Sequence, residues 1–99
     1  MIPQVFPRNP RQALNLARRD LQVHRDRVRW AVKNLRHSVE LAKSHRADAL
    51  PAALAADLLD RRQTLRGQRR AYRRTLRSFI HIRDHVRDLD AVDEQKGAA

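Results

Sequence analysis

The chain has 99 residues, enough for a single domain, and its 22 Lys and Arg residues against 11 Asp and Glu give a formal net charge of +11. This excess favours phosphate-rich or acidic partners. The absence of cysteine excludes disulfides, Cys-based zinc sites and thiol nucleophiles.

Arginine supplies 19 of the 22 basic residues. A genome rich in G and C would raise arginine usage but would not produce the net charge. No apolar run approaches the roughly 20 residues that span a bilayer, and the first residues lack the pattern of a secretory signal. We therefore expect an intracellular, cytoplasmic protein without a membrane contact.

Two glycines and four prolines are too few for the turns of a β protein, so an all-α chain is expected. Pro51 separates two long stretches that are rich in helix formers. Residues 1–8 are expected to form an extended, Pro-rich arm, because proline disfavours helix interiors and central strands. The apolar side chains of this arm, Ile2, Val5 and Phe6, need an apolar surface on this domain or on a neighbour.

A first helix is predicted over residues about 9–46. Asn9 is a favoured N-cap, and Pro10 suits the first helical position. Apolar residues then recur at intervals of seven and form a first seam. The seam consists of Leu14, Leu21, Val28, Leu35 and Ala42, with Ala17, Val32 and Val39 on the same side.

A second helix is predicted over residues about 49–91, capped by Asp48, and followed by a polar tail at 93–99 that is expected to fray. A second seam consists of Leu58, Leu65, Tyr72, Phe79 and Val86, flanked by Leu54, Leu76, Ile82 and Leu89. Two seams of similar length joined by a short turn predict a long antiparallel helical hairpin with coiled-coil packing over residues 9–92.

Two features weaken the second seam. Arg61, Gln68 and Thr75 stand where leucine would be expected, so the middle of the core is polar. Gly67 lies mid-helix, where glycine costs about 1 kcal/mol relative to alanine. Either it breaks the helix and gives three helices, or it permits a close approach along neighbouring small residues. We favour the close approach.

The first helix carries a second apolar line about 160° from its seam, which one hairpin partner cannot cover. A lone hairpin also buries little surface. The line is therefore expected to contact a second copy, another chain or the arm. Trp30 is its expected anchor, because tryptophan is enriched at binding hot spots. This predicted protein interface consists of Leu16, Val23 and Trp30, with His37 and Leu41 nearby.

Eight arginines occur within residues 61–77, and no acidic residue lies between Asp60 and Asp84. Seven of them share one arc of about 140°. Like charges four residues apart destabilise a helix, and a solvated face normally mixes both signs. An anionic partner is therefore expected on this arc, which we name the arginine face. It comprises Arg62, Arg66, Arg69, Arg70, Arg73, Arg74 and Arg77.

The first helix adds further basic residues, which are diluted by Asp20 and Asp26 and spread around the helix, and some are expected to extend the arginine face. We expect binding to the nucleic-acid backbone without sequence preference, because the sequence lacks base-reading motifs and a set of stacking aromatics. The expected partner is either DNA or RNA, in either single-stranded or double-stranded form. The alternative is an interaction module or inhibitor that docks on an acidic protein.

The predicted architecture resembles that of Rop-like RNA-binding hairpin dimers and of the small helical subunits of CRISPR effector complexes. This resemblance implies a dimer, or a subunit of a larger nucleoprotein assembly.

Catalytic chemistry is not expected. His81 and His85, four residues apart, could hold a metal with a nearby carboxylate, but Arg83 and Arg87 favour salt bridges with those carboxylates. The sequence has no glycine-rich phosphate loop and no serine in a nucleophile-elbow context. We therefore expect a non-enzymatic protein that uses neither a metal nor another cofactor.

Overall fold

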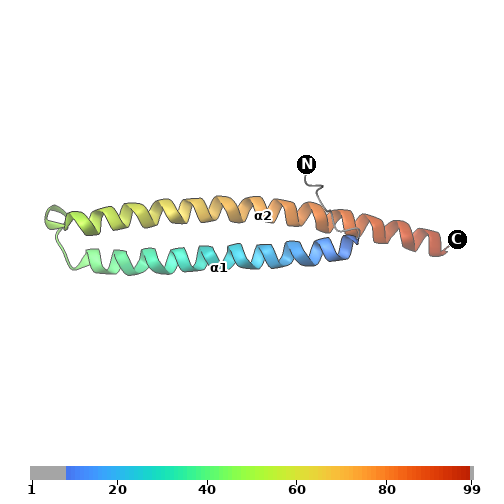
Figure 1. Ribbon diagram of the computed structural model, residues 1–99, viewed down its shortest axis with the longest axis horizontal. Coiled ribbons are helices and arrows are strands. Elements are labelled where there is room, and N and C mark those ends of the chain that lie inside the picture. The colour runs from blue at the N-terminus through green and yellow to red at the C-terminus, as the bar shows by residue number, and fades with distance from the viewer. Residues whose placement is uncertain (1–8, 99) are drawn as a thin grey trace, which may run out of the picture.

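The computed structural model describes residues 9–98 and contains two long helices that lie side by side in opposite directions (Figure 1). Helix α1 spans Pro10–Lys43, a short 3-10 helix, η1, spans Ala47–Ala49, and α2 spans Ala52–Ala98. Of the described residues, 93% are helical and none forms a strand. The predicted all-α antiparallel hairpin is confirmed. The predicted arm at residues 1–8 lies outside the described residues.

Local hydrogen bonds define both ends of α1. Asn9 Oδ1 accepts a 3.0 Å hydrogen bond from the Arg11 backbone N–H, so the predicted N-cap is confirmed. At the other end, Ser44 Oγ donates a 2.7 Å hydrogen bond to the Leu41 carbonyl. This bond occupies a carbonyl that another helical turn would use. The helix therefore ends at Lys43, earlier than the predicted residue 46.

The predicted cap of the second helix is wrong. Asp48 lies in η1, and Leu50 is extended, with φ −68° and ψ 123°, a conformation that the following proline favours. The Pro51 carbonyl then accepts hydrogen bonds from the N–H groups of Leu54 and Ala55, each at 3.0 Å. The second helix therefore begins at Ala52 and not at residue 49.

Gly67 neither breaks α2 nor marks a close approach between helices. The helix is continuous across this residue, and a β-carbon placed there would meet no atom within 4 Å. Flanking helix formers and packing against α1 outweigh a propensity cost of about 1 kcal/mol. Both sequence-based interpretations of Gly67 are therefore wrong, and the residue is simply exposed on one uninterrupted helix.

The end of α2 also differs from the prediction. Residues 93–98 continue the helix instead of forming a frayed tail, because this segment contains Glu, Gln and Lys, which favour helices, and no proline. With 47 residues against 34 in α1, α2 runs past the beginning of its partner (Figure 1). An ion pair of 3.1 Å between Arg11 Nη2 and Asp90 Oδ1 marks the level at which α1 begins.

The two predicted seams face each other along the hairpin. Ala17 and Leu21 of α1 and Leu65 and Val86 of α2 are buried. The other seam and flanking residues are half-buried, apart from Leu89, which is 38% exposed. The core is therefore a single narrow row between two helices.

The centre of this core is small and polar on both helices. Ala31 and Ser38 are buried on α1, although neither belongs to the predicted first seam. Each stands three residues after a seam position and completes the alternating spacing of three and four residues of a coiled coil. On α2, the seam positions of Arg61, Gln68 and Thr75 are half-buried.

Candidate nucleic-acid interface

All seven members of the arginine face are exposed on α2, which keeps them on one arc because the helix is uninterrupted. The eighth arginine of the cluster differs. Arg61 is half-buried and turned toward α1, where its Nη1 donates a 2.7 Å hydrogen bond to the Asn34 carbonyl. Its Nε donates to Asp57 Oδ1 at 3.1 Å. The arginine run is thus divided between an exposed surface and an interhelical contact.

The charge of the arginine face is not neutralised within the described part of the chain. The ion pairs found there involve Arg11, Lys43, Arg61 and Arg83, none of which belongs to this face. Guanidinium groups of this kind keep their hydrogen-bond donors available, and their forked geometry matches phosphate and carboxylate oxygens. The arginine face can therefore accept several anionic groups at once.

Helix α1 extends this surface. Four of its arginines stand either three residues before or one residue after a seam position, which places them about 60–100° to one side of the seam. Members of the arginine face, such as Arg62 and Arg66, stand in the same relation to Leu65. In an antiparallel pair, equivalent flanks of the two helices lie on the same side. The four residues of α1 are Arg18, Arg25, Arg29 and Arg36, and all are exposed.

The helix register brings these residues level with the arginine face. The Asn34–Arg61 hydrogen bond and the Arg11–Asp90 ion pair set residues 18–36 of α1 beside residues 62–77 of α2. We name the four α1 arginines together with the arginine face the basic surface. These four arginines are scattered in the linear sequence, yet their constant offset from the seam is a signal that identifies them.

One of the two acidic residues of α1 that seemed to dilute this charge lies elsewhere. Asp20 directly precedes Leu21, on the flank opposite Arg18 and Arg25. Asp26 stands on the outer side of α1, where it lines the groove beside Trp30. The basic surface is therefore more uniform than the linear sequence indicates.

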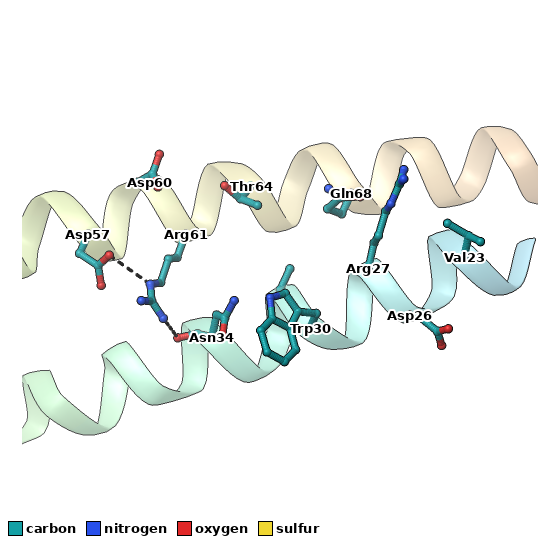
Figure 2. Close-up of a pocket in the computed structure, with 11 residues that line it drawn as sticks. Val23, Asp26, Arg27, Trp30, Asn34, Asp57, Asp60, Arg61, Thr64 and Gln68 are labelled. Carbon is teal, nitrogen blue, oxygen red and sulfur yellow. Dashed lines mark hydrogen bonds and ion pairs between the residues drawn. The ribbon is translucent and has the colours of Figure 1, made fainter. Parts of the chain in front are cut away.

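The opposite side carries the second apolar line of α1. Leu16, Val23 and Trp30 are 45%, 48% and 63% exposed, so α2 does not cover them, as predicted. Val23 and Trp30 line a groove of about 700 Å³ between the helices, together with Thr64 and Gln68 of α2 (Figure 2). The hairpin therefore presents a basic side and a side of mixed apolar and polar character.

One end of the groove holds an interhelical polar cluster, which includes the two Arg61 contacts (Figure 2). Ser38 Oγ donates a 2.7 Å hydrogen bond to Asp57 Oδ2. This bond is the main reason that the pKa of Asp57 lies below its ordinary value of 3.8; desolvation opposes the shift, and Arg61 adds to it. A carboxylate of low pKa is a weak proton acceptor at neutral pH, so the cluster suits a role in holding the helices in register.

The histidines near the end of α2 are exposed, and Arg83 Nη2 lies 3.3 Å from Asp84 Oδ1, the salt bridge expected for this aspartate. Among residues 9–98, no three His, Asp or Glu side chains are grouped in a way that could hold a metal ion. His81 and His85 therefore stand without a third ligand in the described chain.

Comparisons with protein-family models, with curated proteins and with solved structures find no match to this chain. Over residues 9–98, neither helix has a segment that is long and apolar enough to cross a membrane.

Proposed function

We propose that this protein is a small, non-enzymatic nucleic-acid-binding protein that contacts the phosphate backbone through the arginine face. The observation that carries this proposal is the arginine face itself: seven exposed guanidinium groups on one arc of α2, outside the ion pairs formed within residues 9–98. A row of phosphates would supply the opposing charge. The arginines of α1 on the same side would add contacts.

The distribution of aromatic residues supports backbone contact over base stacking. Trp30 lines the groove and is not part of the basic surface, while Tyr72 and Phe79 are half-buried at seam positions. Single-strand binding usually uses exposed rings on which bases stack. Phosphate contacts position a partner without reading its sequence, so similar affinity for unrelated sequences is expected.

The test is a filter-binding measurement with unrelated nucleic acids over a range of salt concentrations. If four to six phosphates are neutralised, log K should fall with log salt at a slope of roughly −3 to −5. Replacing Arg66, Arg69 and Arg73 with Gln should reduce the magnitude of this slope by about 2 to 3, since each lost phosphate contact removes about one unit.

A control variant, in which Arg27, Arg46 and Lys96 are replaced by Gln, removes the same charge from outside the basic surface and should leave the slope nearly unchanged. Equal effects of the two variants would indicate a general charge effect and would contradict the proposal. Weak nucleic-acid binding by the wild type near physiological salt, with salt-sensitive binding to an acidic protein, would favour the alternative interaction module.

A further inference from the structure

The outer side of α1 carries two parallel rows with a spacing of seven residues. The first row is the second apolar line, which passes through Leu16, Val23 and Trp30. The second row stands three positions further along and alternates in charge. It consists of Arg19, Asp26, Lys33 and Glu40, and all four side chains are exposed.

The charged row is complementary to itself in one orientation. If a second α1 lies antiparallel across the first, with a two-fold axis beside Trp30, Asp26 of each copy faces Lys33 of the other. The same operation sets Arg19 opposite Glu40. A parallel arrangement would instead set this row against the opposite flank of the partner helix, so the row would not meet itself.

We infer that the second apolar line of α1 is the interface with a second copy of this chain, packed antiparallel about a two-fold axis near Trp30. Such an isologous contact is the commonest form of homodimer. Apolar side chains would occupy its centre and the charged row its rim, the usual arrangement in protein interfaces. This inference is independent of nucleic-acid binding.

The charge distribution also selects the side on which two copies meet. The basic surface carries one sign and would repel a second copy, whereas the side with Trp30 mixes both signs. Association through α1 would therefore leave the arginine face of α2 exposed on each copy. The assembly would contain four long helices and would cover Trp30, a residue that is 63% exposed in the single chain.

Existing contacts of the charged row do not oppose this arrangement. Lys33 Nζ lies 5.7 Å from the centre of the Trp30 ring, and Glu40 Oε1 accepts a 3.0 Å hydrogen bond from Lys43 Nζ. Asp26 accepts a 2.9 Å hydrogen bond from Gln22. Exposed contacts of this type contribute little to stability, so replacing them with contacts between copies would cost little free energy.

Sedimentation equilibrium of the full chain is the first test. The wild type should approach twice its chain mass of 11.6 kDa at tens of micromolar. A wild type that remains monomeric would overturn the inference. If, in that monomer, deletion of residues 1–8 shifted the Trp30 emission toward that of a solvated indole, the arm would be assigned as the true occupant of the line.

Charge reversal supplies a sharper test. Asp26→Lys and Lys33→Asp, made separately, should each weaken self-association by about tenfold, because two symmetric pairs change from attraction to repulsion. Mixing the two variants should restore dimers, since the lysine introduced in one variant would face the aspartate introduced in the other. Residues 26 and 33 lie about 10 Å apart along one helix, so this rescue cannot arise within a chain.

Arg66→Asp is the matched control, because it reverses a charge on the basic surface and should leave self-association unchanged. Circular dichroism should show equal helicity in all variants. Self-association that is insensitive to both reversals, or variants that weaken association but fail to form a mixed dimer, would overturn the antiparallel α1 interface.

Discussion

Ser38 Oγ and Asp57 Oδ2 lie 2.7 Å apart across the hairpin, and the serine side chain is completely buried. The aspartate side chain is 40% exposed, so water can still solvate the carboxylate that the serine contacts. Arg61 joins the same aspartate to the backbone of Asn34. These directional contacts oppose a slip of one helix along the other, which an apolar seam alone would resist less.

The Ser38–Asp57 contact makes stability dependent on pH. Because the folded protein lowers the pKa of Asp57 below 3.8, the stabilisation is fully present above that value and is lost as pH falls through the lower, folded pKa. The difference in unfolding free energy between wild type and Asp57→Asn should be constant from about pH 5 to pH 7 and should shrink below about pH 4. Urea unfolding at several pH values measures it. Asp60→Asn, on the exposed side of the same turn, is the control, and a difference that persists at low pH would contradict this assignment.

Because the core is a single row of side chains, the loss of unfolding free energy on truncating a leucine should depend mainly on how deeply that leucine is buried. Leu65 is 8% exposed and Leu59 is 59% exposed on the same helix. Leu65→Ala should lower the unfolding free energy by about 2–4 kcal/mol, through lost burial and a cavity. Leu59→Ala should change it by less than about 0.5 kcal/mol. Chemical unfolding at equal protein concentration compares them, and similar losses would place the core elsewhere.

Gly67→Ala should stabilise the protein. The residue lies in an uninterrupted helix, and an added β-carbon would meet no atom within 4 Å. Removing the helical penalty of glycine should raise the unfolding free energy by about 0.5–1 kcal/mol. Thermal unfolding should show a midpoint roughly 2–8 °C higher. A lower midpoint would contradict the assignment of Gly67 to an open position on an uninterrupted helix.

The arginines of α1 should contribute to the proposed nucleic-acid contact. Replacing Arg25, Arg29 and Arg36 with Gln should reduce the magnitude of the salt slope by about 1 to 3, depending on how many of them reach phosphates. The same salt titration measures this effect. An unchanged slope would confine the contact to α2.

Heptad spacing was sufficient to predict the hairpin, because a seam of apolar residues determines which sides of two helices meet. It was insufficient at Ala31 and Ser38, whose small or polar side chains give no apolar signal. Their burial depends on the opposing helix. Two local signals also conflicted near Asp48. Aspartate is a favoured N-cap, but Pro51 favours an extended conformation at Leu50, so the helix begins only after the proline.

The arginine face could be located from sequence, since positions on one helix follow from the turn angle alone. Its continuation through Arg18, Arg25, Arg29 and Arg36 required the direction and register of both helices. Arg61 could be placed in the seam, but its partners could not be named. Asn34 is 27 residues away in sequence and reaches Arg61 only in the folded hairpin.

The two ends of the hairpin differ in the contacts that hold α1 and α2 together. At one end, the helices are joined by the connecting turn and, near it, by the contacts among Ser38, Asp57 and Arg61. At the open end they are joined by the Arg11–Asp90 ion pair, whose side chains are 72% and 48% exposed. Under tension applied to the two termini, the helices would separate first at the open end, and the separation would proceed toward the connecting turn. The molecule thus has a mechanical polarity that its nearly uniform helical appearance conceals.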